Sequence, residues 1–136
     1  MKRRVVVTGL GAVTPIGIGA ETAWNALLSG TSGMGRITRF DPEGFPCQIA
    51  AEVKNFNPLD YIESKEIKKM DTFIHYAVAA SQMAMDDAGV KTFDGDERAG
   101  VYVGSGIGGI NAIEQWHNVL LEKGPKRITP FFIPMS

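Results

Sequence analysis

Apolar residues along the chain follow two spacings, one typical of strands and one typical of helices. The short apolar runs at residues 3–8 and 101–103 predict strands buried on both faces of a mainly parallel sheet. A further short strand is expected at residues 48–53. Apolar residues at a three- and four-residue spacing predict helices at residues 20–29, 72–88 and 110–121. A short charged helix is expected at residues 63–70, where lysines recur at the same spacing. The predicted order is β, α, β, α, α, β, α, which indicates an α/β fold.

The strand at residues 101–103 leads directly into a glycine-rich turn, GSGIGG, at residues 104–109. This turn satisfies G-x-G-x-x-G between a strand and a helix, which is the dinucleotide-binding fingerprint. That mechanism also needs an acidic residue at the end of the next strand, about 20 residues on. Glu122 has this spacing but belongs to the helix pattern, and glycine makes up 16 of the 136 residues. Close backbone packing is therefore the preferred interpretation, and a dinucleotide-binding oxidoreductase domain remains an alternative.

Composition narrows the possible classes of protein. A chain of 136 residues with 44% hydrophobic and 21% charged residues fits one domain with a core of its own. The net charge of -1 argues against a general nucleic-acid binder. The chain has no apolar run close to the roughly 20 residues of a membrane span. Only three apolar residues follow Arg4 before Thr8, too few for a secretion signal. We expect a cytoplasmic protein with no membrane or nucleic-acid partner.

Few residues are candidates for catalysis or metal binding. Cys47 is the single cysteine, so the chain has no internal disulfide, and this fits a reducing compartment. His75 and His117 have no second histidine or cysteine at metal-ligand spacing, so we expect packed or exposed side chains and no metal site. Asp71 is placed to cap the longest helix.

Two surface features allow both a simple and a functional interpretation. Lys65, Lys68 and Lys69 share one helical face, which by itself predicts a solvated surface. Near the end of the chain, Phe131, Phe132 and Ile133 stand among three prolines and must pack on something. Core closure, a ligand channel and a second subunit all fit this second pattern.

Four motifs, in order and at matching spacing, resemble the β-ketoacyl-[acyl-carrier-protein] synthases, most closely those of type II in bacterial fatty-acid elongation. They are VVVTGLGAVTPIG near the start, SKEIKKMD, GSGIGG and PFFIP. The resemblance spans essentially the whole chain. It implies a thiolase-like α/β fold, of which residues 1–136 would form the N-terminal part of the first βαβαβ half. It also implies that the glycine pattern matches a dinucleotide site by coincidence.

The resemblance implies a homodimeric acyltransferase that elongates acyl thioesters by decarboxylative Claisen condensation with malonyl carrier protein. No metal or nucleotide cofactor is expected. The family uses a nucleophilic cysteine and two histidines, and Cys47, His75 and His117 do not match them. We therefore expect the catalytic residues to lie beyond residue 136 and this chain alone to be inactive. A non-catalytic, chain-length-factor-like subunit is an alternative with the same scaffold.

The resemblance also assigns binding roles to residues of this chain. Ile107 matches a family position that lines the acyl pocket near the dimer interface, and Phe132 and Ile133 match residues that complete it. The basic patch that receives the acidic acyl carrier protein is matched by Lys65, Lys68, Lys69, Lys126 and Arg127. Exposed cations would speed association with such a partner and make its affinity sensitive to salt.

Overall fold

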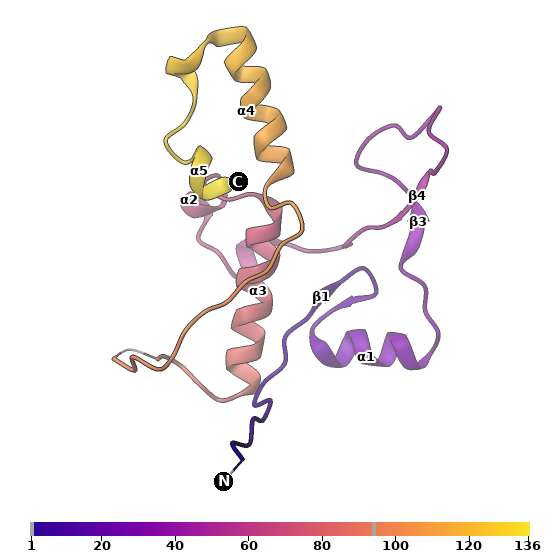
Figure 1. Cartoon of the computed structure of the whole chain (residues 1–136). Helices are drawn as coiled ribbons and strands as arrows, with labels where there is room; N and C mark the ends of the chain where they lie inside the picture. The colour runs from indigo at the N-terminus through magenta and orange to yellow at the C-terminus, as the bar shows by residue number, and fades with distance from the viewer. Residues whose placement is uncertain (1, 94) are drawn as a thin grey trace. The chain divides into compact units, whose positions relative to one another are not determined.

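The computed structural model describes residues 2–93 and 95–136 (Figure 1). The chain divides into two compact units, and helix α3 (Thr72–Asp87) contributes residues to both. The first unit comprises the residues up to Asn57 together with Ala80–Lys91. The second comprises Pro58–Ala79 and the residues from Thr92 to Ser136.

The first unit contains two short antiparallel strand pairs and one helix. Its elements are β1 (Val13–Thr14), β2 (Gly17–Ile18), α1 (Ala20–Leu28), β3 (Met34–Arg36) and β4 (Ile49–Ala51). In the first pair Val13 lies opposite Ile18, and in the second Gly35 lies opposite Ala50. Strand β4 confirms the strand predicted around residues 48–53, and α1 confirms the first predicted helix. The sequence did not predict the other three strands, which are two or three residues long.

Glycines of the first unit bring the segment after residue 8 against the second half of α3. A Cβ atom at Gly9 would collide with the carbonyl oxygen of Ala84, and one at Gly11 would collide with that of Ala80. The Leu10 amide donates to Oδ2 of Asp87 at 2.8 Å. The glycines are therefore needed for close approach of two backbones.

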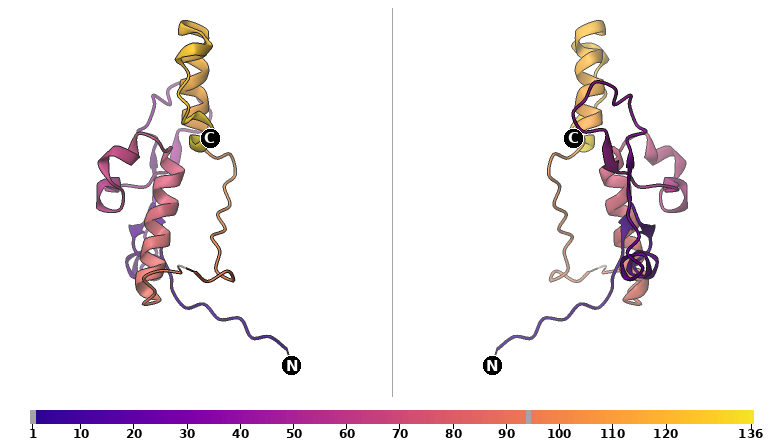
Figure 2. Two further views of the ribbon diagram at one scale, coloured as in Figure 1. Left: turned by 90° about the vertical axis from the view of Figure 1, so that its left-hand side faces the viewer. Right: turned by 90° about the vertical axis from the view of Figure 1, so that its right-hand side faces the viewer.

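The second unit is helical. It contains η1 (Pro58–Asp60), α2 (Ser64–Ile67), the first half of α3, α4 (Ile110–Lys123), η2 (Pro125–Arg127) and α5 (Phe132–Met135). Ala79 on α3 is fully buried, as its small side chain allows. Helices α3 and α4 confirm two predicted helices, whereas the helix predicted at residues 63–70 is confined to α2. Figure 2 shows α4 from two further sides.

The strands predicted at residues 3–8 and 101–103 are wrong as elements of this structure. Neither segment forms a strand, and no parallel ladder is present among residues 2–93 and 95–136. A strand requires a hydrogen-bonded neighbour, and neither run has one here. The side chains are accordingly exposed, with Val5 at 94% and Tyr102 at 100%. Both segments are rich in apolar residues, but their side chains are not buried in a sheet.

Candidate functional site

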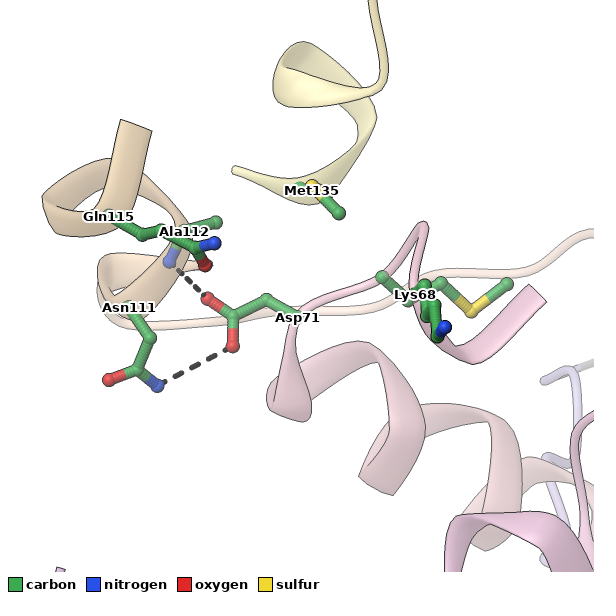
Figure 3. A pocket seen from close by; sticks show the side chains of 7 residues that line it. Lys68, Asp71, Asn111, Ala112, Gln115 and Met135 are labelled. Carbon is green, nitrogen blue, oxygen red and sulfur yellow. Dashed lines mark hydrogen bonds between the residues drawn. The ribbon is translucent and has the colours of Figure 1, made fainter. Parts of the chain in front are cut away.

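The carboxylate of Asp71 joins the beginnings of two helices in the second unit. One oxygen, Oδ2, accepts a 2.8 Å hydrogen bond from the Ala112 amide in the first turn of α4. The other, Oδ1, accepts from the Thr72 amide at the start of α3 and from Nδ2 of Asn111 at 3.4 Å. Figure 3 shows the carboxylate pointing at the N-terminal turn of α4. The sequence predicted the contact with α3, but α4 lies 40 residues away along the chain and was missed.

The glycines before α4 allow a second close contact, with the end of α5. The Gly109 amide donates to the carbonyl oxygen of Ser136 at 3.0 Å. A Cβ atom at Gly109 would collide with the carbonyl oxygen of Met135, and Gly108 has a φ of 74°. Side chains are therefore excluded at both positions by packing and backbone conformation. This confirms the close-packing interpretation for Gly108 and Gly109, whereas a Cβ atom at Gly104 or Gly106 would meet no atom within 4 Å.

The same geometry argues against the dinucleotide alternative. A pyrophosphate at the start of a helix needs free amide groups and a positive local field. Here the amides of Gly109 and Ala112 already donate to Ser136 and Asp71. The Asp71 carboxylate also places a negative charge at the position where a phosphate would bind.

The residues matched to an acyl pocket lie on two segments that meet at the start of α4. Ile107 belongs to the turn before α4 and is 68% exposed. Phe132 is half-buried and Ile133 is exposed on α5, whose C-terminal carbonyl group holds Gly109. The structure thus brings the two segments together and leaves Ile107 and Ile133 accessible.

A cavity of about 400 Å³ lies beside Asp71 in the second unit (Figure 3). Its lining mixes charged, amide and apolar side chains: Lys68, Met70, Asp71, Asn111, Ala112, Gln115 and Met135. Methionine side chains adapt their shape easily, so this wall is deformable.

The five matched cations fall into two groups. Lys65, Lys68 and Lys69 lie on or just after α2, and Lys68 lines the cavity beside Asp71 at the start of α4. Lys126 and Arg127 lie on η2, directly after the other end of α4 (Figure 1). Because α4 has 14 residues, about 21 Å of helix separates its two ends. The second group borders an open groove of about 690 Å³, lined by Trp116, Val119, Lys123 and Arg127.

Two of the lysines are already engaged. Lys65 lies 2.7 Å from Glu63, and both side chains are largely exposed. Lys69 lies 2.7 Å from Glu66 and is half-buried. An exposed pair such as Lys65–Glu63 contributes about 0–1 kcal/mol, so a charged partner can displace it at little cost.

Comparison with known sequences identifies the family. The sequence profile described as "Beta-ketoacyl synthase, N-terminal domain" matches residues 2–136. The chain belongs to the β-ketoacyl synthase family. Its fold class is therefore the α/β, thiolase-like one that the four motifs implied, and the resemblance is confirmed.

Comparison with individual members of the family shows what share of their length this chain spans. A relative from Vibrio harveyi, 3-oxoacyl-[acyl-carrier-protein] synthase 2, is 47% identical over 99% of this chain and 33% of its own length. Among solved structures, "The ishigamide ketosynthase/chain length factor" matches with a TM-score of 0.79 and 35% identity, over 99% of this chain and 34% of that one. The chain spans about a third of the length of these β-ketoacyl synthases.

One solved relative was captured with a partner. It is described as a type II PKS acyl-carrier protein in complex with its ketosynthase bound to the hexaketide. It matches with a TM-score of 0.78 and 26% identity, over 98% of this chain and 35% of that one.

The two histidines and the single cysteine of this chain do not match the catalytic residues of the β-ketoacyl synthases. His75 is buried, with Nε2 3.2 Å from the Ile67 carbonyl oxygen, so it is a packed side chain. His117 is exposed on α4. Cys47 is exposed, and its thiol contacts the Ile49 carbonyl oxygen at 3.5 Å. In the described part of the chain, no three His, Cys, Asp or Glu residues cluster as metal ligands would.

One carboxylate outside the candidate site has a perturbed titration. The hydroxyl and amide of Thr38, followed by the Arg39 amide and charge, hold the pKa of Glu52 below its ordinary value of 4.5. The Thr38 hydroxyl donates to Oε2 at 2.7 Å. This contact links the segment after β3 to the residue after β4, so it supports the hairpin and not the site.

Proposed function

We propose that the protein carrying this chain is a 3-oxoacyl-[acyl-carrier-protein] synthase of type 2. It would elongate fatty acyl chains by decarboxylative condensation of an acyl thioester with malonyl carrier protein. The observation that carries this proposal is the 47% identity to a synthase of that name over nearly the whole chain. We further propose that it acts in the cytoplasm as a homodimer. Among the described residues, no helix is both long and apolar enough to cross a membrane.

In this proposal the chain supplies binding surfaces. Ile107, Phe132 and Ile133 would line the acyl pocket, and their apolar side chains favour transfer of an alkyl chain out of water. The meeting of their two segments at the start of α4 supports this assignment. The exposed positions of Ile107 and Ile133 leave both side chains free to contact a ligand or a second subunit.

The two cationic groups would receive the carrier protein. The exposure of Lys65, Lys68, Lys126 and Arg127 supports this role, because charges that stay hydrated until contact steer an acidic partner and set its orientation. Since the two groups lie beyond opposite ends of α4, we propose that they contact two separate acidic regions of the carrier protein. The solved complex of a related ketosynthase with its carrier protein supports a partner of this class.

The condensation itself would be performed by residues outside this chain. The family's nucleophilic cysteine accepts the acyl group from its thioester. Loss of CO2 from the malonyl group then yields the carbanion that attacks the carbonyl carbon of the acyl-cysteine, with two histidines assisting. The new carbon–carbon bond replaces the carbon–sulfur bond, and the cysteine leaves as the thiolate. Cys47 does not match that cysteine, and its exposed thiol contacts the Ile49 carbonyl oxygen. We therefore propose that residues 1–136 form an incomplete N-terminal part of the synthase domain.

The test uses the full-length protein with hexanoyl and malonyl carrier protein. We expect a 3-oxoacyl product and CO2 in equal amounts, measured by mass spectrometry and by release of labelled CO2. Absence of product with an intact, dimeric protein would overturn the proposal.

A second candidate is a non-catalytic subunit of the chain-length-factor kind. The 35% identity to a solved ketosynthase/chain length factor favours it. Acylation separates the two candidates, because a synthase gains the mass of the acyl group on a cysteine and a chain length factor does not.

A further inference from the structure

We propose that Asp71 is a positioning residue that sets the acyl-chain-length selectivity of the enzyme. It would do so by fixing the turn that carries Ile107 and, through Gly109, the α5 segment. This inference rests on the proposed function and assigns a role to a residue that would not touch the acyl chain.

The first step is the link between two helix starts. Asp71 is 9% exposed and accepts from Thr72, Asn111 and Ala112, so each carboxylate oxygen is engaged. Both helices direct the positive ends of their dipoles at this one carboxylate. A shorter side chain would leave the Ala112 amide unpaired in a buried position.

The second step leads from the start of α4 to the two candidate pocket segments. A Cβ atom at Gly109 would lie 3.0 Å from Oδ2 of Asp71, so this backbone packs directly on the carboxylate. Gly109 also donates to the Ser136 carbonyl group at the end of α5. The preceding turn is closed by a 3.0 Å hydrogen bond from the Gly108 amide to the Ser105 hydroxyl. Ile107 lies inside that turn, two residues before Gly109.

The third step is that little else holds Ile107. Its side chain is 68% exposed, so packing does not fix its place, and the backbone on either side of it does. A pocket wall limits chain length only while it stays in position. Release of the link at Asp71 should therefore let the wall move away from a long acyl chain.

The test compares Asp71→Ser with the wild type in the full-length enzyme. A serine can still cap α3, but its shorter side chain does not reach the Ala112 amide. We expect kcat/KM for tetradecanoyl thioesters to rise relative to that for hexanoyl thioesters by about tenfold. Amide hydrogen exchange at Gly109 and Ala112 should become faster in the same variant.

Two further variants complete the experiment. Asp71→Asn keeps one carbonyl oxygen as an acceptor, so its selectivity should lie between those of the wild type and Asp71→Ser, and it serves if the serine variant does not fold. Asp87→Ser is the matched control. This variant also removes a carboxylate, one that accepts from the backbone amide of Leu10. It should leave the acyl-chain-length selectivity unchanged.

The outcomes separate this inference from the proposed function. A wild-type enzyme without condensing activity overturns the proposed function and the inference together. A wild type that condenses, with Asp71 variants that lose activity equally for both acyl lengths, overturns only the inference. If the selectivity of Asp71→Ser changes but amide hydrogen exchange at Gly109 and Ala112 does not become faster, Asp71 does not act by positioning, and the inference is overturned.

Discussion

The ammonium group of Lys69 lies 5.3 Å from the centroid of the Phe131 ring. This cation–π contact joins the segment proposed to bind carrier protein to the segment proposed to line the acyl pocket. Contacts of this type contribute about 0.5–1 kcal/mol at exposed sites. Lys69 therefore has a structural role besides its charge, and a charge reversal at this position would disturb both segments at once.

Lys65 is the cleaner probe of carrier-protein docking, because the Glu63 side chain with which it pairs is itself largely exposed. Lys65→Glu in the full-length enzyme should weaken binding of the carrier protein by about five- to tenfold at low salt. The loss should shrink as ionic strength rises, since salt screens exposed charges. Surface plasmon resonance at two salt concentrations measures both effects.

The control for this variant is Lys91→Glu, which makes the same charge change at an exposed residue of the first unit. It should leave the affinity nearly unchanged. Equal losses in Lys65→Glu and Lys91→Glu would show that only net charge matters and would remove the docking assignment.

Ile107→Trp tests the acyl-pocket assignment directly. The larger ring should fill the space proposed for the distal part of the chain. We expect kcat/KM to fall by about tenfold or more for tetradecanoyl thioesters and to change little for hexanoyl ones. Leu121→Trp adds similar bulk at another exposed apolar residue, on α4, and serves as the control. Equal losses across acyl lengths in Ile107→Trp would contradict the assignment.

Gly11→Ala tests the close approach of two backbones in the first unit. The added methyl group would collide with the Ala80 carbonyl oxygen and lie 2.8 Å from the Ala84 nitrogen. We expect the free energy of unfolding to fall by about 1–3 kcal/mol, measured by urea denaturation. In Gly35→Ala the nearest atom to the added methyl is the flexible Lys54 ammonium at 3.9 Å, so this control should lose little. If Gly11→Ala left the free energy of unfolding unchanged, the segment around Gly11 would be able to move away from α3.

Thr38→Val tests the hydrogen bond that lowers the pKa of Glu52. Without the hydroxyl, the pKa of Glu52 should rise toward 4.5, as NMR titration of its side chain can measure. Because the folded-state pKa is below the unfolded one, the wild-type contact stabilises the fold above about pH 4.5. That contribution is lost as the pH falls through the folded-state pKa. Thr31→Val, which removes a hydroxyl bonded to Ser29, should leave the titration of Glu52 as it is.

The sequence by itself determined the three longest helices and the family. The periodicities at residues 20–29, 72–88 and 110–121 predicted α1, α3 and α4 within a few residues, because helical hydrogen bonds and side-chain spacing are local. The four motifs placed the chain among the β-ketoacyl synthases, and the sequence profile confirmed this. The high glycine content and the lack of an acidic residue at the end of a following strand also favoured close packing over a dinucleotide site at residues 104–109.

Only the tertiary structure decided the contacts between distant segments. The apolar runs at residues 3–8 and 101–103 have the composition of strands, but a strand forms only with a neighbour that composition does not reveal. The two groups of cations could not be told apart in the sequence, since their separation depends on which helix lies between them. The link from Asp71 to Ala112 joins residues 41 positions apart, and no local pattern predicts which buried carboxylate will meet a second helix. Tertiary packing therefore fixes the candidate site, because it alone brings the starts of α3 and α4 and the end of α5 together.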